Sequence, residues 1–174
     1  MEPSYNKIPT GISSFDPMIK GGFPAGALVL LLGEVGAGSQ EFTYTSVLML
    51  SQMKADGIQL KHGLKLPERV VYISFTKSRE NVFNSLATYR IANQADIRRS
   101  MTFIDLSGTY FAKSHVPLHW TTDDAVTLKN MGMPQKTKSL IETLIETLEA
   151  HAPGNLVIID SLTDLLRSAL TDKA

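Results

Sequence analysis

The sequence predicts an α/β fold, in which helices cover both faces of a mostly parallel central sheet to form a three-layer α/β/α sandwich. Several short apolar runs are continuous rather than alternating, as is typical of strands that are covered on both faces. Segments with helical periodicity lie between these runs, and strands that alternate with helices favour a parallel sheet. The chain has 174 residues, 43% of them hydrophobic, and is predicted to form one domain over residues 1–174.

Four apolar runs are predicted to be strands, and each is too short and too continuous to resemble the exposed face of a helix. The first precedes a glycine-rich stretch, and the last ends in an acidic residue. The four runs are Ala27–Leu32, Val70–Phe75, Thr102–Leu106 and Leu156–Asp160.

Helical patterns fill the intervals between the predicted strands. One runs from Gly38 to about Lys54, and a second is expected to begin after an N-cap at Ser78. The clearest spans Lys138–His151, where leucines and isoleucines form a single stripe that we predict to be core. Ser139 and Glu142 at its start have the spacing of a capping box.

Two segments show no regular pattern. Residues 56–67 are polar and interrupted by glycine, which predicts a surface loop. Residues 107–136 form a longer loop region, and a structureless loop of that length in a compact domain is either a binding loop or a mobile one.

The composition narrows the function classes. Acidic and basic residues balance at 17 each, so no charge excess points to nucleic acid. The absence of cysteine excludes disulfides and thiolate metal sites. No apolar run is long enough to cross a bilayer, and the first residues lack the pattern of a signal peptide. We therefore predict a cytoplasmic protein without a membrane partner.

A glycine-rich stretch after the first predicted strand resembles a phosphate-binding loop. Its residues are Gly33, Glu34, Val35, Gly36, Ala37, Gly38, Ser39 and Gln40. This is the position of the motif G-x-x-x-x-G-K-[ST], in which glycines let backbone N–H groups turn inward around an anion at a helix N-terminus. The competing interpretation is a glycine-rich turn between a strand and a helix.

Two side chains of that motif are replaced. Ser39 stands where a lysine would hold the β- and γ-phosphates, and Gln40 stands where a hydroxyl would hold Mg²⁺. A hydrogen bond to a charged group contributes roughly 1.5–3 kcal/mol, so loss of the lysine predicts binding weaker by roughly ten- to 150-fold.

The residues before the loop identify a family. Ile8–Asp16 and Gly21–Gly26 closely resemble the signature that leads into the phosphate-binding strand in the KaiC/RadA-like branch of the RecA superfamily of P-loop ATPases. Phe15 departs from this pattern, because a leucine is usual there. The resemblance covers residues 8–166, with residues 1–26 as the N-terminal signature segment and residues 27–166 as the core. It implies a RecA-type P-loop fold, and a full family domain continues past the end of this chain, which is therefore either naturally short or truncated at its C-terminus.

The resemblance also implies roles for residues at two strand ends. Asp160 matches the Walker B acid that holds Mg²⁺ through water, although an acid at this position also suits a helix N-cap. Active relatives carry two glutamates after the strand that here ends at Phe75, and the first polarises the attacking water. This chain has Thr76 and Lys77 instead, and a positioned base contributes about 10²–10⁴-fold in rate.

Lys77 suggests a compensation. Its ammonium is hypothesised to replace part of the missing charge of the phosphate-binding loop, so that nucleotide binds without hydrolysis; an exposed lysine at a strand end is the competing interpretation.

These replacements predict a regulatory or assembly protein that binds ATP or ADP weakly or not at all, holds Mg²⁺ weakly, and does not hydrolyse ATP efficiently. The resemblance implies a homo-oligomer or a pairing with an active RecA/KaiC-like ATPase. Two other functions stay open at this point: a genuine ATPase with unconventional residues, and a DNA-recombination accessory.

Overall fold

The computed structural model describes residues 6–34, 36–111 and 138–171. The chain divides into two compact units, of which unit 1 comprises Met1–Glu68 and Ser85–Met101, and unit 2 comprises Arg69–Asn84 and Thr102–Ala174. Val35 and most of the predicted loop region 107–136 lie outside the described residues.

Unit 1 combines a small antiparallel sheet with two helices that pack together. Strand β1 pairs with β2, and α1 packs on α3. The hydroxyls of Ser51 on α1 and Ser100 on α3 are hydrogen-bonded at 2.6 Å, which ties the two buried helix faces together. The elements of this unit are β1 (Lys7–Ile8), the 3₁₀ helix η1 (Asp16–Ile19), β2 (Phe23–Pro24), α1 (Ser39–Ala55) and α3 (Gln94–Ser100).

The N-terminal signature segment has a structural basis in unit 1. The carboxylate of Asp16 accepts hydrogen bonds from the Thr10 N–H at 2.8 Å, the Thr10 hydroxyl at 2.7 Å and the Gly11 N–H at 3.0 Å. A Cβ on Gly22 would lie 2.3 Å from the carbonyl oxygen of Ile8, so only glycine fits there. Phe15, the departure from the family pattern, packs edge-on against Phe42 with ring centroids 5.0 Å apart. These residues fix the path of the chain toward α1.

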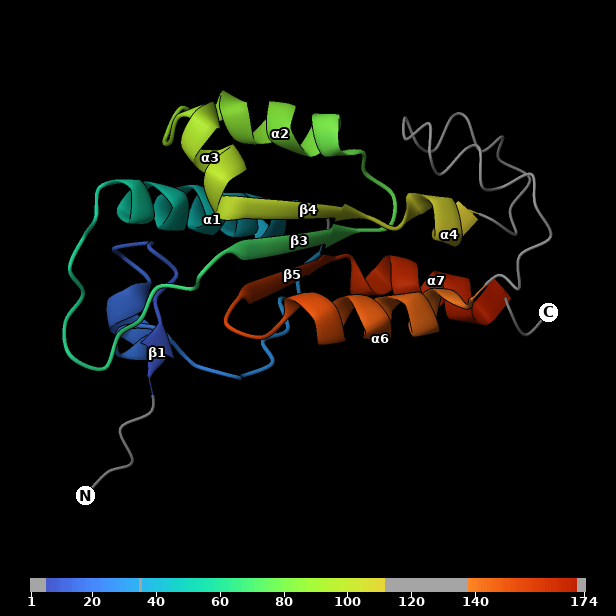
Figure 1. Cartoon of the computed structure of the whole chain (residues 1–174), viewed down its shortest axis with the longest axis horizontal. Coiled ribbons are helices and arrows are strands. Elements are labelled where there is room, and N and C mark those ends of the chain that lie inside the picture. Colours follow the sequence, from blue (N-terminus) through green and yellow to red (C-terminus); the bar gives the residue numbers. More distant parts are fainter. Residues whose placement is uncertain (1–5, 35, 112–137, 172–174) are drawn as a thin grey trace, which may run out of the picture. The chain divides into compact units, whose positions relative to one another are not determined.

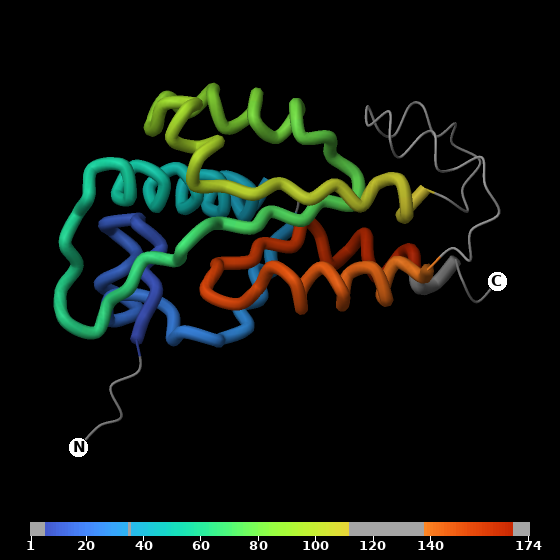
Figure 2. The backbone as a smooth tube through the Cα atoms, viewed as in Figure 1, coloured from blue at the N-terminus to red at the C-terminus, as the bar shows by residue number. Residues whose placement is uncertain are grey.

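The first predicted strand is wrong. Residues 27–32 form neither strand nor helix and run as an irregular trace between β2 and α1 (Figure 2). The side chains of Leu28 and Leu32 are 96% and 85% exposed. A strand requires a neighbour that pairs with its N–H and C=O groups, and no strand pairs with this segment among the residues that the structure describes. Apolar character predicted burial here, but it does not report whether a pairing partner exists.

Unit 2 is built on a three-stranded parallel sheet in the order β4-β3-β5, comprising β4 (Met101–Asp105), β3 (Val70–Ser74) and β5 (Leu156–Asp160). β3 and β5 are parallel, with Val70 opposite Leu156 and Ser74 opposite Asp160. Figure 1 draws β3 and β4 running in the same direction. The parallel sheet with its helices confirms the predicted α/β class and agrees with a RecA-type fold.

One face of this sheet carries the core of unit 2. Val71 and Ile73 of β3, and Phe75 directly after the strand, are buried in it. The other core positions come from the end of β4 and from helix α6 (Leu140–His151), whose Leu140 and Leu144 are buried. Partly buried residues of α4 (Ser107–Phe111) and α7 (Leu162–Thr171) pack against the same cluster.

Helix α6 confirms its predicted start and corrects its predicted face. Ser139 and Glu142 form the capping box, and hydrogen bonds from the backbone and then the hydroxyl of Ser139 lower the pKa of the Glu142 carboxyl. The stripe is not entirely core, because Ile141 and Ile145 are half-exposed. A stripe of adjacent leucine and isoleucine pairs is wider than the contact with one sheet, so its outer edge faces solvent.

The remaining helices show where local patterns suffice. Helix α2 (Arg79–Thr88) begins after Ser78, whose hydroxyl accepts from the Asn81 N–H, as predicted. The short helices α3 and α4 were not predicted, and α4 begins inside the predicted loop region. Helices this short give no periodic signal. No helix in the described ranges is long and apolar enough to span a bilayer.

Replacing Asp16 with alanine tests the structural role of the signature segment. The change removes three hydrogen bonds to one carboxylate, so we expect unfolding to become easier by about 2 kcal/mol. Urea unfolding would measure the loss. Asp56→Ala is the matched control because Asp56 is an exposed acid in the same unit. An equal effect of the two substitutions would contradict the role.

Candidate functional site

The glycine-rich stretch in unit 1 has the backbone of a phosphate-binding loop. Gly36 and Gly38 adopt left-handed conformations with φ of 86° and 84°, and α1 begins directly afterwards at Ser39. The Ala37 N–H donates to the Glu34 carbonyl at 3.0 Å, which closes the turn. An anion site at a helix N-terminus requires N–H groups that point toward the anion, and such a role for this turn stays a prediction.

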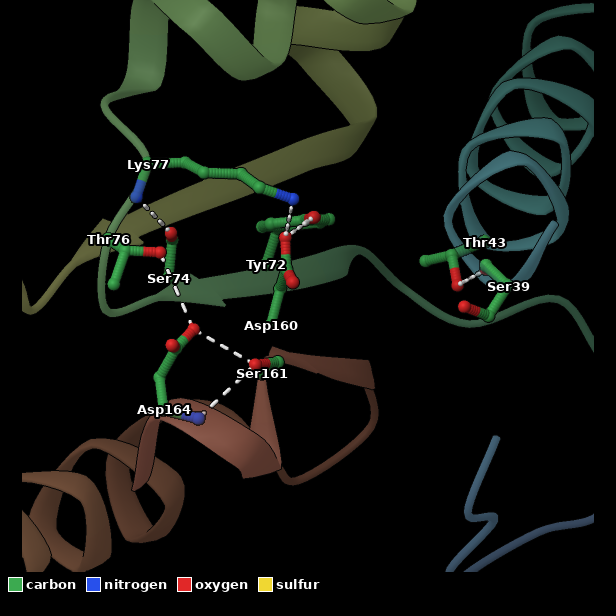
Figure 3. Close-up of polar contacts among 9 residues, drawn as sticks. All are labelled: Ser39, Thr43, Tyr72, Ser74, Thr76, Lys77, Asp160, Ser161 and Asp164. Carbon is green, nitrogen blue, oxygen red and sulfur yellow. Dashed lines mark hydrogen bonds and ion pairs between the residues drawn. The ribbon is translucent and has the colours of Figure 1, made fainter. Parts of the chain in front are cut away.

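The side chains of this loop do not supply the charge that phosphates need. Ser39 and Gln40 are both exposed at the start of α1, and the Ser39 carbonyl accepts from the Thr43 hydroxyl at 2.8 Å, a contact within the helix (Figure 3). The stretch carries one acid, Glu34, and no lysine or arginine, and a second acid, Glu41, follows it. The side chains of the stretch therefore bring no positive charge to an anion.

The residues at the predicted strand ends meet in unit 2. Lys77 follows β3, Asp160 ends β5, and these strands are neighbours in the sheet. The Lys77 ammonium lies 2.7 Å from Oδ2 of Asp160, with side-chain exposures of 33% and 22%. The structure thus brings together two residues that the sequence singled out separately (Figure 3). The Lys77 backbone N–H donates to the buried Ser74 hydroxyl at 2.9 Å, which fixes the turn after β3.

Tyr72 is a third residue in the contact between Lys77 and Asp160, and it was not predicted from the sequence. Its hydroxyl donates to the same Oδ2 of Asp160 at 2.5 Å. Tyr72 lies directly opposite Ile158, so Asp160 is two residues further along the same face, within reach of a tyrosine hydroxyl. The signal was a tyrosine inside a buried strand, because a buried hydroxyl needs a hydrogen-bond partner.

Thr76 belongs to a second contact at this edge. Its hydroxyl is 3.4 Å from Oδ2 of Asp164, which also accepts from the Ser161 hydroxyl at 2.9 Å. The Ser161 hydroxyl in turn accepts from the Asp164 N–H at 3.3 Å and caps α7. Burial, followed by the charge of Asp164, raises the pKa of the nearby Tyr110. The N-cap of α7 is therefore Ser161 and not Asp160, which the sequence offered as a possible N-cap.

Mg²⁺ does not fit at Oδ2 of Asp160. The resemblance has this acid hold Mg²⁺ through water, so a magnesium-bound water would need a free carboxylate oxygen. Oδ2 already accepts hydrogen bonds from an ammonium and a hydroxyl. No cluster of three or more His, Asp or Glu residues with metal-binding geometry occurs in the part of the chain that the structure describes.

The approach of Lys77 to the phosphate-binding loop stays a prediction. The loop belongs to unit 1, while Lys77 and Asp160 belong to unit 2. Within its own unit, the Lys77 ammonium is paired with Asp160. Glu80, the nearest acid after β3, is exposed at the start of α2.

The glycine-rich turn before α1 and the acid at the end of a parallel strand define a P-loop type of nucleotide-binding domain. The family model for the KaiC ATPase matches residues 8–174, and the chain belongs to this family. No curated protein and no solved structure matches the chain.

A double-mutant cycle tests the contact between Tyr72 and Asp160. Tyr72→Phe and Asp160→Asn should each destabilise the protein, and the double variant should lose less than their sum because both remove one hydrogen bond. We expect a coupling energy of about 1–2 kcal/mol in urea unfolding. Tyr110→Phe with Asp160→Asn is the control and should be additive. Additivity for Tyr72 as well would show that its hydroxyl does not contribute.

Proposed function

We propose that this member of the KaiC ATPase family is a regulatory or assembly protein that binds ATP or ADP weakly or not at all and does not hydrolyse ATP efficiently. The observation that carries the proposal is the glycine-rich turn before α1, whose own residues Gly33–Gln40 include no lysine or arginine. Exposed Ser39 and Gln40 replace the lysine and the magnesium-binding hydroxyl.

The edge of the sheet in unit 2 supports the same proposal. The position of the first catalytic glutamate of active relatives is Thr76, whose hydroxyl contacts Asp164 and which has no carboxylate to polarise water. The next position is Lys77, a cation. A missing general base costs about 10²–10⁴-fold in rate, and the loss of transition-state charge neutralisation by a metal comes in addition.

Restoring the motif tests this proposal. The double variant Ser39→Lys with Gln40→Thr should bind ATP or ADP roughly ten- to 150-fold more tightly than the wild type, because it regains a charged hydrogen bond. Thermal stabilisation by each nucleotide measures the affinity, since a ligand that prefers the folded state raises its apparent stability. The matched control is Ser39→Ala with Gln40→Ala. Phosphate release is measured in parallel.

Two results would overturn the proposal. Wild-type phosphate release well above that of buffer would favour a genuine ATPase with unconventional residues. Salt-sensitive DNA binding by the wild type would favour a recombination accessory, because phosphate contacts weaken as salt rises.

We further propose that the chain associates with further copies of itself, and that a cytoplasmic location suits its cysteine-free composition. Support comes from the exposed apolar residues of each unit, because monomeric proteins rarely expose large apolar patches. Unit 1 exposes the segment 28–32, and unit 2 exposes Ile141, Ile145, Leu162 and Leu166. Pairing with an active relative of the same family is the competing form of assembly.

Light scattering after size-exclusion chromatography measures this association. We expect a mass that is a multiple of the 19.1 kDa chain, and we expect Leu28→Ser with Leu32→Ser to reduce it because the exposed apolar segment is lost. Met18→Ser, which alters another highly exposed apolar side chain of the same unit, is the control. A monomer at all concentrations would contradict self-association.

A further inference from the structure

The Lys77–Asp160 contact places a cation on the carboxylate where relatives hold a metal. We propose that the Lys77 ammonium is a built-in counter-ion that excludes divalent cations from Asp160. This inference rests on the proposed function and deepens it, because it gives a physical reason for weak metal binding at this acid.

The first step of the argument is charge. A carboxylate carries one negative charge, and the ammonium at 2.7 Å neutralises it. A divalent ion at the same oxygen would have to displace the ammonium or share the oxygen with it, and two cations at this separation repel strongly in a partly buried site. The pair therefore favours the metal-free carboxylate.

The second step is the fixed geometry of both partners. Tyr72 is 1% exposed, its ring stacks on Phe103 with centroids 5.9 Å apart, and its hydroxyl holds Oδ2 of Asp160. On the other side, the Lys77 backbone is held by Ser74, whose side chain is fully buried. The carboxylate and the ammonium are thus both positioned from the rigid sheet, unlike an ion pair between two long surface side chains.

The third step separates this interpretation from an ordinary ion pair. If the pair were only structural, Lys77→Met would destabilise the fold but would not create a metal site. If the lysine excludes a cation, Lys77→Met would free the carboxylate for a divalent cation, and Lys77→Glu would strengthen that binding with a second oxygen donor of the kind that hard cations prefer.

The test is a titration of the full chain with Mn²⁺ alone, followed by electron paramagnetic resonance of the free ion. Wild type and Lys77→Arg should leave Mn²⁺ free in solution. Lys77→Glu should bind it at least about tenfold more tightly than wild type, and adding Asp160→Asn should abolish this gain. Lys61→Glu makes the same charge change at an exposed loop lysine and should behave as wild type.

Two outcomes would overturn the inference: Mn²⁺ binding by wild type that Asp160→Asn removes, or binding by Lys77→Glu no tighter than that of Lys61→Glu. If circular dichroism shows that Lys77→Glu does not fold, Lys77→Met replaces it, and the comparison of wild type with Asp160→Asn needs no variant at position 77. Phosphate release without Mn²⁺ binding would refute the proposed function alone, whereas Asp160-dependent Mn²⁺ binding without turnover would refute this inference alone.

Discussion

The charge of Asp160 is the constraint on which the edge of the parallel sheet in unit 2 depends. The carboxylate is mostly buried, and a buried charge without a partner is costly. A metal ion would satisfy it in an active P-loop enzyme, but here an ammonium and a tyrosine hydroxyl do so. The acid at the end of β5 and the lysine that follows β3 therefore form one pair, which neutralises the carboxylate without a metal.

The glycines before α1 are required by the backbone itself, whatever the loop binds. Gly36 and Gly38 have positive φ, and Gly38 is the residue from which α1 starts. A side chain at either position would strain the turn whether or not a phosphate binds there. The signature glycine Gly22 is likewise required by contact with the backbone of Ile8. Such glycines are therefore evidence about the fold, whereas the side chains at positions 39 and 40 are evidence about how phosphate and Mg²⁺ would be bound.

The sequence was informative where the determinants are local. Helix α1 and the capping box of α6 follow from periodicity and capping residues, and the strands β3, β4 and β5 follow from continuous apolar runs. The prediction of a strand at residues 27–32 failed because an apolar run carries no information about a neighbouring strand that could pair with it. Tyr72 and Asp164 were missed because their contacts depend on strand register and on the start of α7, which no single segment encodes.

The position of the Lys77 ammonium also constrains its hypothesised role at the phosphate-binding loop. One ammonium that is held at 2.7 Å from Asp160 neutralises that carboxylate, so little net charge is left to attract a phosphate. Release of the ammonium would leave the Asp160 carboxylate mostly buried with Tyr72 as its remaining partner, which is costly for a charged group. The two roles of Lys77 therefore compete, and the described contacts favour the role at Asp160.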